Sequence, residues 1–289
     1  MVRLGAVLSL FDGMSCGQVA LNRAGIDYQF YYASEIDQYA IKVTQHNYPD
    51  TIQVGDIVTL ESSSLPNIDL LMGGSPCQSF STAGKGEGFK GKSGLIYEFF
   101  RLLNECNPKY FLLENVRMKQ EWRDYISGEL GVQPVKINSN LFSAQNRERL
   151  YWTNIPIAQF IDKKIVIKDV LDEVVEDKYW LKTKNTELLL KKIDITGAPD
   201  LACIDVYNKK IKLDNKSPAL TLPHHNSTRV IQHGKIRKLT PIECERLQTL
   251  PIYYTDCNLS DTQRYTMIGN GWTVDVIAHI FKGITEYAT

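Results

Sequence analysis

Short apolar runs that end at a glycine or an acidic residue recur through the first half of the chain. This pattern limits the folds that the chain can adopt. The first run, Ala6–Phe11, leads into a glycine-rich turn and then a helical pattern from Gln18 to Ala24. A strand, a tight turn and a helix in this order form the unit from which nucleotide-binding α/β sheets are built. The recurrence predicts an α/β fold with an open sheet.

A cysteine follows another of these runs. The apolar stretch Ile68–Met72 passes through two glycines into Ser75-Pro76-Cys77. A thiol held on a turn at a strand end is placed to act as a thiolate nucleophile. A buried core position is the alternative, and it is the commoner fate of a free cysteine. Residues 79–94 are rich in Gly and Lys, which predicts a basic lid over an anionic substrate.

Acidic residues stand at the ends of three other predicted strands. Glu35 lies about 20 residues past the glycine-rich turn, the place from which a carboxylate reaches ribose hydroxyls. Asp56 is suited to bind the amino group of a purine or to cap the segment that follows. Glu114 ends a strand whose edge we expect to share with Cys77, where it would hold a proton or cap a helix.

The later part of the chain predicts a second domain and a return to the first. Arg147 and Arg149 alternate on a predicted strand, so we expect both guanidiniums on one side, facing carboxylates or a ligand. Residues 157–236 are polar and turn-rich and predict a small, mostly β or irregular domain. We place the large domain at residues 1–156 and the return segment at 237–289, whose C-terminal helix completes the large domain. Within the return segment, Thr240 and Glu243 predict a capping box at the start of a helix, and residues 267–271 predict a turn.

Charge and cysteine usage limit the function classes. The chain carries 33 Lys and Arg against 33 Asp and Glu, yet Lys178–Lys238 holds 13 basic and 5 acidic residues. Such a local excess suits a polyanion and is also typical of a solvated lysine-rich surface. The six cysteines form no CxxC pair, so we expect no structural metal and reduced thiols in the cytoplasm. No apolar run approaches the length of a membrane span.

Together these stretches resemble the motifs of the cytosine-C5 DNA methyltransferase family, over nearly the whole chain except its polar middle segment. The matching stretches, in the order of the family, are Phe11–Gly17, Glu35, Asp56, Ser75–Gln78, Glu114–Val116, Gln145–Arg149, Arg237–Gln248 and Gly269-Asn270. A single short motif is weak evidence, whereas the six motifs of more than one residue, in the order of the family, are strong evidence. The order therefore favours a nucleophilic role for Cys77 over a core role.

The resemblance implies a Rossmann-like, S-adenosyl-L-methionine-dependent methyltransferase domain with a small target-recognition domain. The catalytic residues that it implies are Cys77, Glu114, Arg147 and Arg149. The implied cofactor-binding residues are Phe11, Asp12, Gly13, Ser15, Gly17, Glu35, Ile36, Asp56, Ile57, Pro76 and Asn270. The implied DNA-binding residues are Gln78, Ser79, Ser81, Lys85, Lys90 and Lys92.

Double-stranded DNA is the implied partner, bound by a cytoplasmic monomer of bacterial or phage type, with or without a cognate restriction endonuclease. Two positions depart from the family pattern: Ser93 stands where many members have Arg, and Gly271-Trp272 replaces a small residue and Val. Three alternatives stay open. They are a tRNA cytosine methyltransferase, whose Cys-Phe-Thr signature is missing from the middle segment, a catalytically silent DNA-binding relative, and a nicotinamide oxidoreductase, which the missing GxGxxG disfavours.

Overall fold

Two compact units make up the computed structural model, which describes residues 2–76, 94–220 and 228–286. The first unit consists of Met1–Ile137, Glu148–Gln159 and Val274–Thr289, and the second of Asn138–Arg147 and Phe160–Thr273. The second unit is thus larger than the small domain expected at 157–236. It includes 138–147 and 237–273 because side chains of these segments hydrogen-bond to one another and to residues 214–220.

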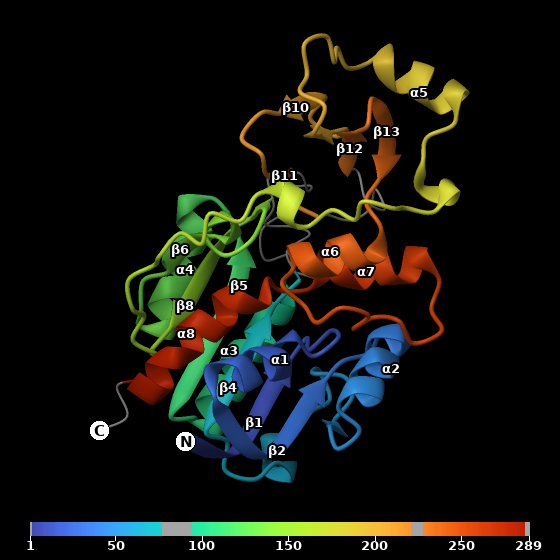
Figure 1. Ribbon diagram of the computed structural model, residues 1–289. Coiled ribbons are helices and arrows are strands. Elements are labelled where there is room, and N and C mark those ends of the chain that lie inside the picture. Colours follow the sequence, from blue (N-terminus) through green and yellow to red (C-terminus); the bar gives the residue numbers. More distant parts are fainter. Residues whose placement is uncertain (1, 77–93, 221–227, 287–289) are drawn as a thin grey trace. The chain divides into compact units, whose positions relative to one another are not determined.

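A seven-stranded sheet forms the centre of the first unit (Figure 1). The first five strands in sheet order are mutually parallel, and β8 runs antiparallel to β5. In sheet order the strands are β3 (Ile52–Gln53), β2 (Ile26–Ser34), β1 (Val2–Leu10), β4 (Leu70–Gly74), β5 (Tyr110–Val116), β8 (Glu148–Thr153) and β6 (Val135–Asn138). This architecture confirms the predicted Rossmann-like α/β fold.

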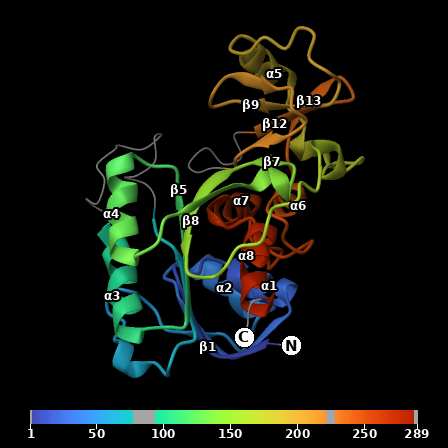
Figure 2. The same cartoon turned by 90° about the vertical axis from the view of Figure 1, so that its left-hand side faces the viewer.

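Helices cover both faces of this sheet, as Figure 2 shows: α1, α2 and α8 lie on one side and α3 and α4 on the other. Their bounds are α1 (Cys16–Ala24), α2 (Gln38–Asn47), α3 (Ile96–Cys106), α4 (Gln120–Leu130) and α8 (Val274–Glu286), and a 3-10 turn spans Ser62–Ser64. The core between sheet and helices includes fully buried Leu8, Phe99 and Trp152. In the described part of the chain, no helix is both long enough and apolar enough to cross a bilayer.

Helix α1 packs closely on the sheet because its second residue is glycine. A Cβ built on Gly17 overlaps Met72 Cε of β4 and lies 2.9 Å from the sulfur of the same side chain and 3.0 Å from the Tyr31 hydroxyl of β2. The family resemblance assigns Gly17 to cofactor binding. The structure gives it a packing role, since it is buried where α1 meets β4 and β2.

The described residues of the second unit form two small sheets and three α-helices. A four-stranded sheet has the order β10 (Lys210–Lys212), β9 (Ala202–Asp205), β12 (Thr228–Gln232) and β13 (Lys235–Lys238), and β7 (Gln145–Asn146) pairs with β11 (Ser217–Pro218). The helices are α5 (Thr183–Leu190), α6 (Pro241–Leu247) and α7 (Asp261–Asn270), with 3-10 turns at Ser139–Leu141, Ile167–Asp169 and Asp177–Tyr179. The capping box predicted at Thr240 and Glu243 is confirmed at the start of α6.

One expectation for this unit is wrong. Residues 267–271 were expected to form a turn, but 267–270 are the last turn of α7. That helix starts at a capping box in which the Ser260 hydroxyl accepts from the Gln263 N–H and the Gln263 side chain accepts from the Ser260 N–H. Gly269 therefore lies inside a helix, because a capped start eight residues earlier outweighs its low helix propensity.

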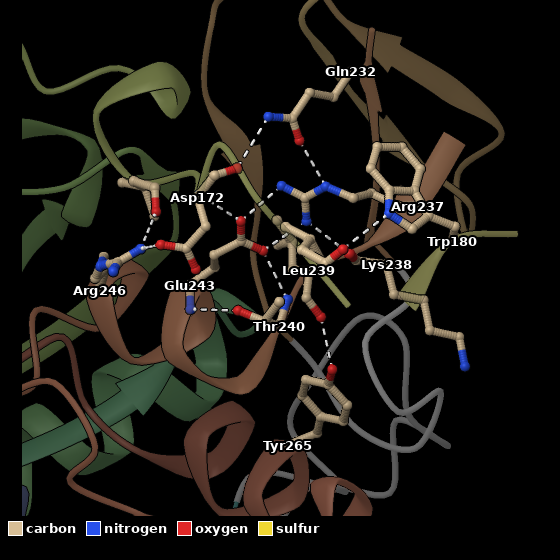
Figure 3. A network of polar contacts seen from close by, with 12 residues as sticks. Asp172, Trp180, Gln232, Arg237, Lys238, Leu239, Thr240, Glu243, Arg246 and Tyr265 are labelled. Carbon is tan, nitrogen blue, oxygen red and sulfur yellow. Dashed lines mark hydrogen bonds and ion pairs between the residues drawn. The ribbon is translucent and has the colours of Figure 1, made fainter. Parts of the chain in front are cut away.

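A buried ion pair between Arg237 and Glu243 joins several segments of the second unit (Figure 3). Both side chains are inaccessible to solvent, and the guanidinium nitrogens lie 2.7 and 2.8 Å from the two carboxylate oxygens. The same carboxylate accepts the N–H groups of Asp172 and Thr240, and the guanidinium also donates to Gln232. Each polar atom is thereby matched, which a buried pair requires.

We expect Gly17→Ala to lower the free energy of unfolding by about 1–3 kcal/mol, the usual cost of overpacking a core. Gly128→Ala in α4 is the matched control, because a Cβ there meets no described atom within 4 Å. It should stabilise the protein by up to about 1 kcal/mol. Urea unfolding followed by circular dichroism compares the two. Equal effects of both substitutions would contradict the packing role of Gly17.

We expect Glu243→Gln to lower the free energy of unfolding by about 3–5 kcal/mol, because it leaves a buried guanidinium without its counter-charge. Asp172→Asn removes the carboxylate of a half-exposed pair with Arg246 and should cost no more than about 1 kcal/mol. Thermal unfolding of both variants measures the difference. A Glu243→Gln protein as stable as Asp172→Asn would show that the buried pair does not hold these segments together.

Candidate functional site

The strand register brings the ends of the parallel strands to one edge of the sheet in the first unit. Leu10, the last residue of β1, is level with Ser34 in β2 and with Gly73 in β4. Gly74, the last residue of β4, is in turn level with Glu114 in β5. Side chains that follow these residues therefore gather at the carboxyl edge, where open α/β sheets bind their ligands.

The turn after β1 is wound tightly around Asp12. Phe11 and Ser15 adopt left-handed conformations at φ 55° and 58°, and Gly13 adopts φ 60°. The Asp12 carboxylate accepts hydrogen bonds from the Ser15 hydroxyl and, at 2.7 Å, from the Tyr31 hydroxyl. Burial raises the pKa of Asp12 from 3.8 to about 6 although these hydrogen bonds oppose the shift. The turn thus holds a carboxyl group that titrates near neutrality.

Glu35 closes the same turn from β2. Its Oε2 accepts the Gly13 N–H at 2.8 Å, and its Oε1 accepts the N–H groups of Ile36 and Asp37 at 2.7 and 2.8 Å. Asp37 caps α2 by accepting from Tyr39 N–H. Three backbone donors therefore fix the orientation of the Glu35 carboxylate at the edge of the sheet.

The end of β3 adds an exposed carboxylate. Asp56 is exposed, and its Oδ1 accepts the Val58 N–H at 3.0 Å, so it caps its own turn while facing solvent. Ile36, at the end of β2, is 71% exposed, which leaves an apolar surface at this rim. Ile57 differs from its neighbours, because its side chain is buried in the hydrophobic core.

Glu114 and Arg149 form an ion pair across β5 and β8. Arg149 is paired with Val116, two residues along β5 from Glu114, so the two side chains stand diagonally on one face. Arg149 Nε lies 2.9 Å from Glu114 Oε1, and the side chains are 15% and 12% exposed. A mostly buried carboxylate and guanidinium thus lie side by side at the carboxyl end of β5.

Asn115 joins the end of β5 to the end of β4. Its Nδ2 donates to the Ser75 hydroxyl at 2.9 Å, and its Oδ1 accepts the Val116 N–H at 2.8 Å. Both Asn115 and Ser75 are buried. The hydrogen bond from Asn115 therefore fixes the chain at Ser75, which is followed in the sequence by Pro76 and Cys77.

Several residues predicted for the site lie in the second unit or outside the part of the chain that the structure describes. Arg147 does not share a strand with Arg149 as expected; it stands between β7 and β8 and donates to the carbonyls of Leu220, Gly269 and Gly271 in the second unit. Asn270 is the exposed last residue of α7 in that unit. The predicted residues that lie outside the described part of the chain are Cys77, Gln78, Ser79, Ser81, Lys85, Lys90 and Lys92.

A buried polar network beneath the turn after β1 was not predicted from the sequence. Gln18 of α1 donates to Ser15 and to Thr51 and accepts from the Tyr28 hydroxyl, while Thr44 of α2 donates to Ser15. These residues are 3 to 33 positions apart in the chain, and apart from Ser15 none belongs to a motif. The polar Gln18 on a buried helix face was the available signal, because buried amides require partners.

A protein-family model matches nearly the whole chain, including the described site residues of the first unit. The model of the C-5 cytosine-specific DNA methylase family matches residues 5–286.

Curated relatives of the chain are methyltransferases of phages and bacteria. The chain is 32% identical over 238 residues to the orphan methyltransferase M.SPRI of Bacillus phage SPR, a match that covers 65% of this chain and 54% of the relative. It is 31% identical over 280 residues to the type II methyltransferase M1.ScrFI of Lactococcus lactis subsp. cremoris, covering 88% and 72%. The matched region spans about half the length of the two phage relatives M.SPRI and M.Rho11sI.

Solved structures share the fold. The methyltransferase EhMeth of Entamoeba histolytica has a TM-score of 0.74 at 18% identity, covering 99% of both chains. The Dnmt2 methyltransferase of S. pombe has a TM-score of 0.69 at 18% identity, covering 100% of both.

We expect Asp12→Asn to become progressively more stable than the wild type as pH rises from 4 to 7. The Asp12 pKa of about 6 lies above its ordinary value of 3.8, so the folded protein holds this proton more tightly than the unfolded chain. Wild-type stability contributed by the proton is present below pH 4 and is lost as pH rises through 6. Asn cannot ionise and escapes that loss, which reaches at most about 3 kcal/mol. Parallel curves of melting temperature against pH would contradict this account.

Proposed function

The chain belongs to the C-5 cytosine-specific DNA methylase family, and from this premise we propose that it transfers a methyl group from S-adenosyl-L-methionine to carbon 5 of cytosine in duplex DNA. The observation that carries the proposal is the Glu114–Arg149 pair, in which Oε1 and Nε lie 2.9 Å apart. Glu114 is level with the end of β4, the strand that leads to Cys77.

Cytosine requires activation before carbon 5 accepts a methyl group. In the proposed reaction the Cys77 thiolate forms a bond to carbon 6, and the electron pair of the C5–C6 double bond shifts so that carbon 5 becomes nucleophilic. S-Adenosyl-L-methionine, when bound, supplies an electrophilic methyl group. After carbon 5 is methylated, a base removes the proton from carbon 5, the C5–C6 double bond re-forms, and the sulfur leaves as thiolate.

Glu114 and Arg149 would stabilise the charge that develops on the ring during addition. Glu114 would hold the proton at ring nitrogen 3 and accept from the exocyclic amino group, while Arg149 would donate to the base carbonyl. Their mutual ion pair and limited exposure support this assignment, because fixed groups in a poorly solvated site act without reorganising during the reaction.

The carboxyl edge of the first unit fits the proposed methyl donor. The Glu35 carboxylate, oriented by three N–H groups, would accept from ribose hydroxyls, and exposed Asp56 would accept from the adenine amino group. Exposed Ile36 would contact the adenine ring. A Cβ at Gly13 meets no described atom within 4 Å, so the turn leaves space at this point for a ligand to approach the backbone.

Duplex DNA hides the target ring inside the base stack. The proposed reaction therefore requires the cytosine to be flipped out, at a cost of a few kcal/mol. We propose that residues 79–94 and the basic residues of Lys178–Lys238 bind the DNA and hold the flipped state, since their Lys-rich composition suits phosphate contacts.

We expect Cys77→Ser to abolish methyl transfer to duplex DNA, because an alcohol is a far weaker nucleophile than a thiolate. Tritium transfer from labelled donor to duplex DNA and to tRNA, side by side, measures both the activity and the choice of nucleic acid. Cys106→Ser is the control, a half-buried cysteine on α3. Full turnover by Cys77→Ser would refute covalent catalysis, and transfer to tRNA alone would replace the proposed substrate.

We expect Glu114→Gln to slow the transfer step by about 10²–10³-fold, the usual effect of losing one group that stabilises developing charge. Glu148→Gln on the adjacent strand is the matched control, because Glu148 pairs with exposed Lys136 at 3.6 Å. Single-turnover rates of both variants provide the comparison. An unchanged rate in Glu114→Gln would mean that another group activates the ring.

A further inference from the structure

Gln145 and Arg147, on either side of Asn146, hold the segment Asp214–Leu220 and the end of α7. We propose that these two side chains are positioning residues for DNA recognition, which set the sequence specificity of the enzyme and do not contact the reacting base. The inference rests on the proposed function and departs from the catalytic role that the family resemblance gives Arg147.

The segment Asp214–Leu220 is attached to residues 138–147 along its whole length. Asp214 accepts from the Asn146 side chain at 2.8 Å, and the Lys216 ammonium donates to the carbonyls of Asn140 and Ser143. Ser217 N–H donates to the Ala144 carbonyl at 2.7 Å, where β11 pairs with β7. The segment therefore takes its conformation from the strand that carries Gln145 and Arg147.

Leu220 is held by both of its peptide groups. Its N–H donates to Gln145 Oε1 at 2.9 Å, and its carbonyl accepts from Arg147 Nη1 at 2.7 Å. Gln145 is fully buried and Arg147 is 5% exposed, so water does not compete for these bonds. Two side chains thus fix the position and direction of the backbone at Leu220, the last described residue before 221–227.

The same side chains are anchored at the C-terminal end of α7. Arg147 Nη2 donates to the carbonyls of Gly269 and Gly271, both at 3.1 Å. Gln145 donates to Gln248 Oε1, and Gln248 Nε2 donates to the carbonyls of Ile268 and Gly271. A guanidinium is stabilised here because unsatisfied carbonyls and the helix dipole give this end a negative potential.

This bonding suits positioning better than chemistry. Three hydrogen bonds of the Arg147 guanidinium go to backbone carbonyls of the second unit, where its planar geometry serves three acceptors at once. Base recognition depends on side chains placed to within a fraction of an ångström. A shift of the 214–220 backbone would therefore degrade discrimination between DNA sequences before it affects bond making at the cytosine.

The test compares Arg147→Lys and Gln145→Asn with the wild type. A plasmid is methylated briefly in vitro and read by bisulfite sequencing, which yields the ratio of methylation at preferred sites to methylation at sites one base pair different. We expect both variants to lower this ratio by at least about fivefold, the discrimination associated with one base pair. The single-turnover rate at preferred sites should fall less than about tenfold.

Arg246→Lys is the matched control, because Arg246 also binds a backbone carbonyl of the second unit, that of Val170, and is paired with Asp172. Its ratio should equal that of the wild type. Unchanged ratios in both test variants overturn the inference, as does a 100-fold loss of single-turnover rate at an unchanged ratio, which would make Arg147 catalytic. If Arg147→Lys does not fold, Gln145→Asn decides. A wild type that methylates no cytosine would instead refute the proposed function.

Discussion

The register of the parallel strands is the constraint on which the rest of the structure depends. Because Leu10, Ser34 and Gly73 are level, and Gly74 is level with Glu114, every residue that follows these strands reaches one edge of the sheet. Asp12, Glu35 and Ser75 are brought together in this way although they come from distant motifs. A change of one residue in register would turn each of these side chains to the opposite face.

Motif residues that are close in the sequence lie in different units of this protein. Arg149 pairs with Glu114 at the sheet edge, whereas Arg147, two positions earlier, stabilises backbone carbonyls in the second unit. Arg237 and Arg264 likewise neutralise the buried carboxylates Glu243 and Glu245. The second unit thus buries hydrogen-bonded guanidiniums as well as apolar side chains, among them the cluster around Ile204 and Ile231 in its four-stranded sheet.

Local sequence patterns predicted what local physics decides. The capping box at Thr240 and the buried strand before Gly73 are found as expected, because caps and apolar runs act over a few residues. Helix α7 and the position of Arg147 were missed. The acceptors of Arg147 lie 73 and 122 residues away, and no local signal in the sequence encodes such a distance.

Covalent attack by one thiolate is the central claim, and trapping the adduct tests it most directly. A duplex in which 5-fluorocytosine replaces the target cytosine cannot lose its substituent at carbon 5 as a proton, so the enzyme should remain attached to the DNA once the methyl group has been transferred. Proteolysis and mass spectrometry of the complex should locate the modified base on the peptide that contains Cys77, with S-adenosyl-L-methionine present. A methylated product with no cross-link, or a cross-link at another residue, would contradict the account.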